Sequence, residues 1–302
     1  KTTRNSLILL LTATIWGMAF VSQSKGMDYM HPFTFNGVRS LIGAAGILVY
    51  ILISRKIAGD KAAKLDWKLN VKAGLLCGIF LTTASTLQQF GIKYTSVGKA
   101  GFITTLYIIF VPMFGIFLKK KVAPVVWAAA GMAAVGMYLL CMTESLRLGA
   151  GDIMVFLCAI AFAIQIMTVD HYAARIDGAV VSCIQFTVCG VVCCIGALIW
   201  GQPTFGQIQE GLGALLYAGV LSCGVGYTLQ IVGQKGLNPT VAALIMSLES
   251  VIATISGWIA YKIGFLSTDQ TLTPRQIAGC VIVFAAVILV QLPPEWFRFG
   301  KK

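Results

Sequence analysis

The sequence predicts an all-α membrane protein with ten transmembrane helices arranged as two inverted five-helix repeats. Hydrophobic residues make up 58% of the 302 positions and charged residues 11%, against about 25% charged residues in soluble domains. The mean hydropathy is +0.85. The last five apolar stretches also repeat the pattern of the first five. Because five is an odd number, the second half is expected to begin on the opposite side of the membrane from the first.

Ten apolar stretches have about the length of a membrane span. An α-helix needs roughly 20 apolar residues to cross the hydrocarbon core. In chain order, the expected spans are 5–24, 32–53, 71–92, 97–118, 124–142, 151–170, 179–200, 211–233, 239–262 and 275–292. The connecting segments are too short for a soluble domain, so one membrane domain is expected.

The first span is predicted to be a retained helix and not a cleaved secretory signal. Lys1 and Arg4 precede an apolar run, as they would in a signal peptide. However, the run is long, contains Trp16-Gly17 and is followed by no small-x-small cleavage site. Its counterpart at 151–170 lies inside the chain, which also favours a membrane span.

The repeat is visible residue against residue in the third and eighth spans. With an offset of 142, Leu87–Lys93 aligns with Leu229–Lys235, and Leu, Gln, Gly and Lys match without a gap. The sequence therefore predicts an N-terminal repeat over 1–145 and a C-terminal repeat over 146–302, which together form the membrane domain.

The beginnings of the two halves align with an offset of 146. Trp16 then falls on Phe162, and the turn at His31-Pro32 falls on Asp177-Gly178. The difference of four residues between the two offsets belongs to the loop after the second span, which is longer than its counterpart after the seventh.

Basic residues are distributed by side of the membrane. The chain carries 23 Lys and Arg residues against 11 Asp and Glu residues, with a net charge of +12. The loop at 54–70 and the Lys119–Lys121 run fall on the side of the N-terminus, whereas the loops at 142–150 and 263–274 fall on the other side. The positive-inside rule therefore predicts a multi-pass protein of the plasma (inner) membrane with both termini in the cytoplasm. Since the cations form no stripe on one face, nucleic acid is not an expected partner.

Several segments resemble the EamA-like branch of the drug/metabolite transporter superfamily, and the resemblance covers the whole chain. They are Ile15–Phe20, Arg39, Gly91–Ala100, Leu237–Ala243 and Leu248-Glu249. The resemblance implies ten spans, transport of metabolites such as amino acids, often outward, and a substrate cavity lined mainly by spans 1, 3, 4, 6, 8 and 9. In that family a proline commonly follows Leu-Glu in the ninth span, where this chain has a serine.

Two full charges, Arg39 and Glu249, are expected well inside the hydrocarbon region. Such charges are costly, so they usually face a bundle interior, a partner or water. Arg39 shares a helical face with Asn36 and is either an anchor for a substrate carboxylate or phosphate, or a structural group that bonds backbone carbonyls. Glu249 is either a titrating group that couples transport to protons, or a hydrogen-bonded acid that holds the ninth helix to its neighbours.

Aromatic and amide side chains at related positions of the two halves predict a chamber near the membrane midplane. The predicted substrate-binding residues, with Arg39, are Trp16, Gln88, Gln89, Tyr107, Phe162, Gln165 and Gln230. Thr104, Thr105 and Tyr227 are further candidates for its walls. Aromatic faces with a few amides suit a compact organic molecule better than a bare ion.

The third span carries an unusual number of polar residues. Thr82, Thr86 and Gln89 follow a spacing of four and three residues, so they share one helical face, which must point away from lipid. Hydrogen bonding to neighbouring helices and lining of the chamber are both open explanations for this face.

No motif indicates an enzyme or a bound cofactor. The sequence has no phosphate-binding or dinucleotide-binding glycine pattern, and its two histidines, His31 and His171, stand at span ends without a metal-ligand spacing. The nine cysteines lie in or beside apolar spans and are expected to be packing residues. No metal or cofactor is therefore expected.

The predicted function is a secondary transporter of small organic metabolites that works by alternating access. An amino acid or a related amphiphilic solute is the expected substrate, with export the expected direction. A passive channel and a carrier for anionic metabolites such as nucleotides or sugar phosphates are the alternatives. The expected partners are the substrate, the lipid bilayer and, through Glu249, protons; the sequence leaves a monomer or a homodimer open.

Overall fold

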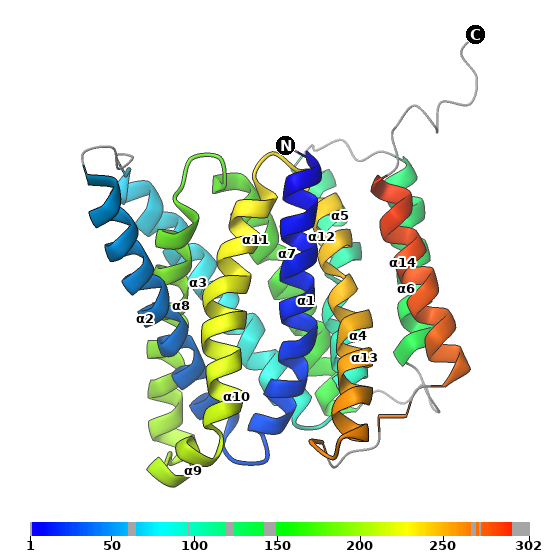
Figure 1. The fold of residues 1–302 in the computed structure, drawn as a ribbon. Coiled ribbons are helices and arrows are strands. Elements are labelled where there is room, and N and C mark those ends of the chain that lie inside the picture. The colour runs from blue at the N-terminus through cyan, green and yellow to red at the C-terminus, as the bar shows by residue number, and fades with distance from the viewer. Residues whose placement is uncertain are drawn as a thin grey trace.

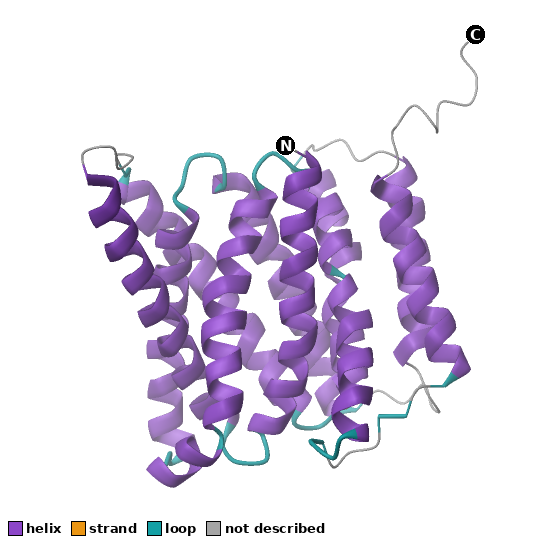
Figure 2. Cartoon of the chain, in the orientation of Figure 1, coloured by secondary structure: helices purple, strands orange, loops and turns teal. Residues whose placement is uncertain are grey.

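The computed structural model describes residues 2–59, 65–95, 97–118, 124–141, 149–266, 270–271 and 273–291, and every regular element among them is a helix (Figure 2). The first half contains α1 (Thr2–Gly26), α2 (Pro32–Ala58), α3 (Trp67–Ile92), α4 (Val97–Thr105), α5 (Tyr107–Phe117) and α6 (Pro124–Cys141). The second half contains α7 (Ala150–Tyr172), α8 (Gly178–Gly196), η2 (Ala197–Gly201), α9 (Phe205–Glu210), α10 (Leu212–Leu216), η3 (Tyr217–Gly226), α11 (Tyr227–Gln234), α12 (Pro239–Met246), α13 (Leu248–Lys262) and α14 (Pro274–Gln291).

Eight helical segments within the described ranges are long and apolar enough to cross a membrane. They coincide with the first four predicted spans and with the sixth to the ninth. The fifth and tenth predicted spans fall on α6 and α14, whose apolar parts are shorter. The all-helical membrane fold is thus confirmed, whereas the count of ten transmembrane helices remains a prediction.

The contacts between helices follow the symmetry of the repeat. The second helices of the two halves, α2 and α8, pack against each other, and so do the fifth helices, α6 and α14. The third helix of the first half, α3, packs against α7, the first helix of the second half. Correspondingly, α1 packs against η3 and α11 of the third span in the second half. The first helix of each half thus packs against the third span of the other half, as expected when two related halves pack around a common axis.

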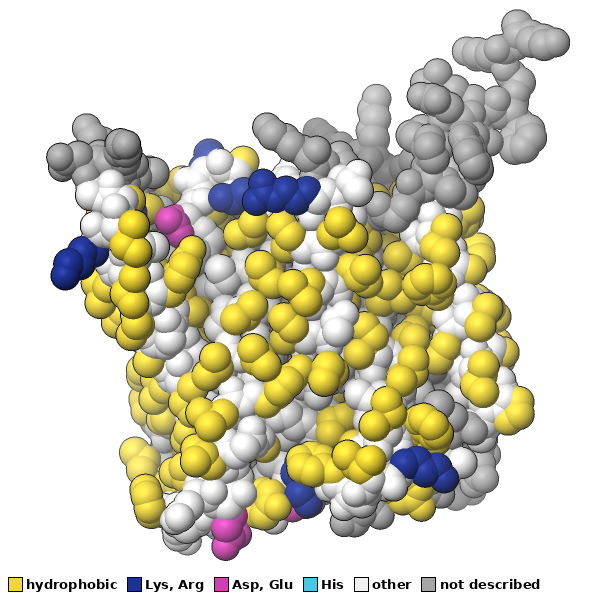
Figure 3. Space-filling model, viewed as in Figure 1, with side chains coloured by type: hydrophobic (Ala, Val, Ile, Leu, Met, Phe, Trp, Pro, Cys, Tyr) yellow, Lys and Arg dark blue, Asp and Glu magenta, His cyan; other side chains and the backbone are white. Residues whose placement is uncertain are grey.

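The two halves run in opposite directions across the layer of helices. In Figure 1, α1 begins at the face where α14 ends, whereas α7 begins at the opposite face. On the side of the molecule seen in Figure 3, hydrophobic side chains cover the middle belt, and charged side chains lie near its two ends. The Lys119–Lys121 run and most of the loop at 142–150 fall outside the described residues. The cytoplasmic location of the termini therefore remains a prediction.

Equivalent caps begin the second helix of each half. The Nδ1 atom of His31 accepts a hydrogen bond from Phe33 N at 3.4 Å at the start of α2. At the start of α8, Asp177 Oδ1 accepts one from Ala179 N at 2.9 Å. A cap that accepts from these N–H groups satisfies donors that have no partner within the helix. The alignment of His31-Pro32 with Asp177-Gly178 thus matches the way the two helices start.

Two central spans depart from α-helical geometry at equivalent places. Leu106 separates α4 from α5, and Ser247 separates α12 from α13. At the first interruption Leu106 N bonds to Ile103 O, and at the second Ser250 N bonds to Ser247 O, so each span tightens into a short i to i+3 turn. The pattern of apolar residues does not reveal these turns, and each span was expected as one regular helix.

The eighth span contains a π-helical segment, η3, between α10 and α11. Its wider turns change which residues face the interior, because side chains no longer recur every 3.6 residues. A further short helix, α9, precedes this span and was not expected from the sequence.

A leucine at Gly17 is expected to destabilise the fold, because Gly17 lies where α1 crosses α13. A Cβ atom there would stand 2.6 Å from Ile252 Cβ and 2.7 Å from Glu249 O. Such overpacking typically costs about 1–3 kcal/mol. The thermal unfolding midpoint of purified Gly17→Leu should therefore fall. Gly46→Leu is the matched control, since nothing lies within 4 Å of the Cβ it would add. Equal midpoints for the two variants would contradict the close packing of α1 on α13.

Candidate functional site

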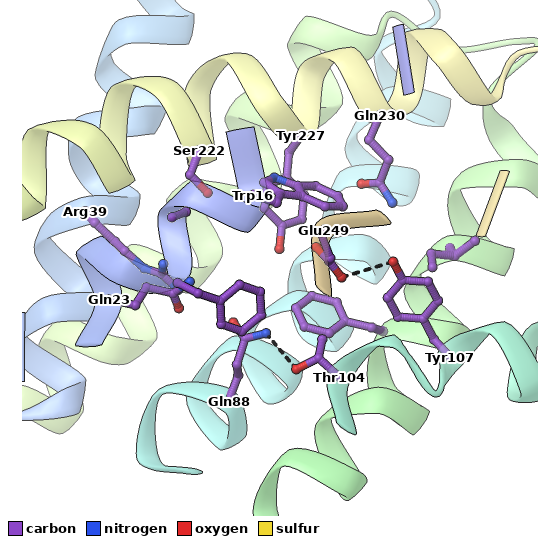
Figure 4. A pocket seen from close by; sticks show the side chains of 14 residues that line it. Trp16, Gln23, Arg39, Gln88, Thr104, Tyr107, Ser222, Tyr227, Gln230 and Glu249 are labelled. Atoms are coloured by element: carbon purple, nitrogen blue, oxygen red, sulfur yellow. Dashed lines mark hydrogen bonds between the residues drawn. The ribbon is translucent and has the colours of Figure 1, made fainter. Parts of the chain in front are cut away.

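A small central cavity collects most of the residues that the sequence singled out (Figure 4). The predicted site residues that line it are Trp16, Arg39, Gln88, Tyr107, Phe162, Gln230 and Glu249. They come from α1, α2, α3, α5, α7, α11 and α13, so both halves contribute. The cavity has a volume of about 30 Å³, which is room for about two water molecules.

Glu249 and Tyr107 form a hydrogen bond between equivalent positions of the two repeats. The Tyr107 hydroxyl donates to Glu249 Oε1 at 3.0 Å, across 142 residues of sequence. That separation equals the offset that aligns the third and fourth spans with the eighth and ninth. Both residues are buried, with Glu249 only 3% exposed. Tyr107 directly follows the first i to i+3 turn and Glu249 lies within the second, so both residues stand beside the interruptions of their spans.

Arg39 supplies a cation to the same cavity. It is 6% exposed, and its guanidinium lies over the ring of Phe35, at 5.4 Å from the centroid. Within the described part of the chain, its Nε atom has no hydrogen-bond partner. Figure 4 shows Arg39 on one side of the cavity and the Glu249–Tyr107 pair on the other. Among the described residues, no ion pair joins Arg39 to Glu249.

The glutamines divide into those that line the cavity and those that lie behind its wall. Gln88 lines it, and its Nε2 donates to Thr104 Oγ1 at 3.1 Å. Gln230 also lines it and exchanges hydrogen bonds with Gln165, the shorter of which is 3.2 Å.

Two predicted lining residues, Gln89 and Gln165, do not reach the cavity. Gln165 is the outer partner that holds Gln230 in place. Gln89 lies one residue further round α3 than Gln88, so it points toward α1 and donates to Gln23 O at 3.1 Å. Both amides are therefore positioned behind the wall, where they orient neighbouring groups.

Aromatic rings form another wall. The rings of Trp16 and Tyr227 have centroids 4.5 Å apart, and Tyr227 meets Phe186 edge to face at 5.0 Å. Trp16 Nε1 has no hydrogen-bond partner among the described residues. Phe162, which aligns with Trp16 in the repeat, lines the cavity as well. These rings offer an apolar surface together with one indole donor.

Some lining residues were not found from the sequence. They are Ala19, Phe20, Gln23, Ile166 and Ser222. Gln23 lies two helical turns after Trp16 in an otherwise apolar run, so helical spacing was a usable signal for it. Ser222 lies in the π-helical segment, where regular spacing gives no guide.

The polar residues of the third span serve mainly to join helices. Ser85 and Thr86 contact the sulfur atoms of Cys189 and Cys193 on α8, at 3.4 and 3.5 Å. Thr82 bonds to the carbonyl of the preceding turn, at Gly78 O. Of this stretch only Gln88 lines the cavity. Hydrogen bonding within and between helices thus accounts for most of the polarity of α3.

Within the ranges that the structure describes, no group of three or more His, Cys, Asp or Glu side chains is placed to hold a metal ion. The polar groups around the cavity are one guanidinium, one carboxyl, amides and hydroxyls. This donor set can bind the charged and polar ends of an organic molecule between aromatic rings.

Comparison with known proteins identifies a family. The model of the EamA-like transporter family matches residues 4–142 and again residues 149–292. An uncharacterized transporter of Archaeoglobus fulgidus is 28% identical over 94% of this chain and 84% of its own length. The uncharacterized transporter YwfM of Bacillus subtilis is 24% identical over 96% of this chain and 94% of its own.

A solved crystal structure shares the fold. It superposes with a TM-score of 0.75 over 98% of this chain and 99% of its own, at 16% sequence identity. Two family matches that together cover nearly all residues, and a cavity built from both matched segments, agree with the repeat found in the sequence. The chain therefore belongs to the EamA-like transporter family, and it is a multi-pass membrane transporter and not an enzyme.

Proposed function

We propose that this transporter is a secondary carrier that exports a small zwitterionic organic solute, such as an amino acid, by alternating access. The central cavity lies between the two repeats, where inverted-repeat carriers bind their substrates. The i to i+3 turns at Leu106 and Ser247 support the proposal, because tightened segments inside a helix often mark hinges.

The observation that carries the proposal is a pair of opposite charges that line one cavity without pairing with each other. Arg39 offers a cation whose Nε lacks a partner among the described residues. Glu249 offers a carboxyl that one hydroxyl donor already reaches. An unpaired buried charge is costly, so a substrate carboxylate that pairs with Arg39 would be bound favourably. A substrate ammonium group would then be directed toward Glu249, with its apolar part against Trp16.

The size of the cavity supports a carrier in preference to a passive channel. A volume of about 30 Å³ is far below the roughly 300–1,000 Å³ of sites for drug-sized ligands. An organic solute therefore enters only after the helices move apart. A carrier requires such a movement in every cycle, whereas a passive pore does not.

A carrier for anionic metabolites is the second candidate, and Arg39 is the observation in its favour. Glu249 argues against it when ionised, because a carboxylate in the same cavity repels a phosphate or a second substrate carboxylate. A substrate with one anionic and one cationic group satisfies both ends of the cavity.

Counterflow in proteoliposomes tests the substrate class. Vesicles are preloaded with one unlabelled compound and diluted into a trace of the same compound in labelled form. We expect transient accumulation with a neutral amino acid, because a carrier exchanges substrate while an open pore only equilibrates it. The amide of the same amino acid, which lacks the carboxylate, and its N-acetyl form, which lacks the ammonium, should accumulate much less.

Two outcomes would contradict the proposal. Accumulation with nucleotides or sugar phosphates alone would favour the anion carrier. Rapid equilibration that neither saturates nor shows counterflow would favour the channel. Empty vesicles, and vesicles that hold the Gly17→Leu variant, control for leakage and for misfolded protein.

A further inference from the structure

A second and much larger cavity lies at one end of the helices, away from the central site. It has a volume of about 600 Å³ and lies between the C-terminal turns of α2 and residues of α11. Its inner wall includes Asn70 near the start of α3 and Gly178 at the start of α8. We call this cavity the basic cleft, after three cations in its lining: Arg55, Arg175 and Lys235.

The cations of the basic cleft come from three different elements. Arg55 lies in the last turn of α2, Arg175 in the loop between α7 and α8, and Lys235 directly after α11. The Lys235 ammonium donates to Ile176 O at 3.3 Å, and an ammonium group has three such donors. The three cations thus border one cavity from separate parts of the chain, and the Arg175 guanidinium also donates to His171 O at 3.5 Å.

The two carboxylates in the lining are engaged at helix starts. Asp66 Oδ1 accepts from Leu69 N at 3.0 Å and caps α3. Asp177 Oδ1 accepts from Ala179 N and Val180 N and caps α8. A carboxylate at a helix N-terminus interacts with the positive end of the helix dipole. Both carboxylates keep their charge, so the described lining of the basic cleft holds three cations against two carboxylates, an excess of one positive charge.

Asn70 holds the walls of the basic cleft together. Its side-chain amide donates to Asp66 O at 2.8 Å, and its Oδ1 accepts from Asp177 N at 2.9 Å. Asn70 is itself buried. The start of α3 and the start of α8 are thus fixed to each other, so the cleft is a built cavity between helix ends.

The mouth of the basic cleft is apolar on its membrane side. Tyr50, which lines it, is 61% exposed, and Ile51 and Val232 also belong to the lining. Figure 1 shows α2 leaning away from α11 toward this end of the molecule. A ligand that fits must therefore place an anionic group among the cations and an apolar part between two helices that face lipid.

We propose that the basic cleft binds an anionic phospholipid, with its phosphate headgroup among Arg55, Arg175 and Lys235 and an acyl chain against Ile51 and Val232. Basic cavities between transmembrane helices are suited to such headgroups, and a tyrosine at the rim suits the membrane interface. A free phosphate ion satisfies the cations but not the apolar mouth. The proposal does not depend on the transported substrate.

Native mass spectrometry of the delipidated full-length protein tests this assignment. The protein is titrated with dioleoyl phosphatidylglycerol and, separately, with dioleoyl phosphatidylcholine. We expect preferential binding of phosphatidylglycerol. Arg175→Gln and Lys235→Gln should each weaken it about fivefold, and the double variant about 25-fold, on the scale of one surface cation per step. Phosphatidylcholine binding should change little.

Lys262→Gln is the matched control, since it removes one cation at the end of α13 and leaves the basic cleft intact. An equal effect of Lys262→Gln would overturn the proposal, because it would show a response to net charge alone. Equal binding of the two lipids would also overturn it. Displacement of phosphatidylglycerol by equimolar inorganic phosphate or chain-free glycerophosphoglycerol would show a free-anion site in place of a lipid site. If the double variant does not fold, the two single variants decide the outcome.

Discussion

Arg39→Gln is expected to weaken substrate binding strongly while the protein remains folded. The guanidinium is buried, lines the central cavity and has an Nε atom without a partner in the described chain. Among the described residues its removal therefore breaks no hydrogen bond from Nε, and it relieves the cost of a buried charge that has no carboxylate partner there. A substrate carboxylate, in contrast, loses the one cation among the described residues that line the cavity. Affinity should fall at least about 30-fold, which corresponds to roughly 2 kcal/mol or more.

Isothermal titration of a neutral amino acid into the purified variant measures this loss. Arg39→Lys should give an intermediate affinity. An ammonium group keeps the charge but lacks the planar pair of N–H donors with which a guanidinium binds both carboxylate oxygens. The thermal unfolding midpoint of substrate-free protein serves as the folding control. A folded Arg39→Gln protein with unchanged affinity would remove Arg39 from the binding site.

Glu249→Gln is expected to separate transport from the proton gradient. Among the residues that line the central cavity, Glu249 is the only carboxyl, so it is the group there that can take up and release a proton. An acidic medium outside substrate-loaded vesicles should accelerate efflux through the parent protein. Efflux through Glu249→Gln should proceed at the same rate with and without the gradient. Counterflow, which needs no gradient, should persist at a lower apparent affinity, because glutamine keeps the size and the acceptor oxygen of the side chain but loses the charge that faces the substrate ammonium.

Tyr107→Phe is the matched control for the Glu249 prediction. It removes the hydroxyl that donates to Glu249 Oε1 but keeps the carboxyl. The response of efflux to the gradient should therefore remain. If efflux through Glu249→Gln responds to the proton gradient as fully as the parent does, the prediction of proton coupling through Glu249 is wrong. If Glu249→Gln and Tyr107→Phe both unfold, the pair is a structural contact that holds α13 to α5.

Much of the fold was predictable because it follows from local composition and from the repeat. Apolar length located the eight spans that the structure supports, and the offset of 142 placed Gln88 and Gln230 at related positions before any contact was known. The departures from regular helix were not predictable in this way. The turn at Leu106, the turn at Ser247 and the π-helical segment η3 depend on how neighbouring helices pack.

The site was predictable as a set of residue types but not as a set of contacts. Deep polar residues must face inward, yet the sequence does not say which helix each of them meets. Gln88 and Gln89 are adjacent and chemically identical, and only the rotation of α3 decides that one lines the cavity while the other bonds to α1. Gln165 was likewise recognised as interior, but its partner, Gln230, stands between it and the cavity.

The hydrogen bond between Tyr107 and Glu249 has a consequence for the energetics of any transport cycle. If two inverted halves were identical, a twofold rotation would convert the inward-facing form into the outward-facing form, and the two would have equal free energies. Any preference between them must therefore come from positions where the halves differ. At this central position one half supplies a phenol that donates and the other a carboxyl that accepts. The pair is therefore one position at which the inward-facing and outward-facing forms of an alternating-access cycle would differ in free energy.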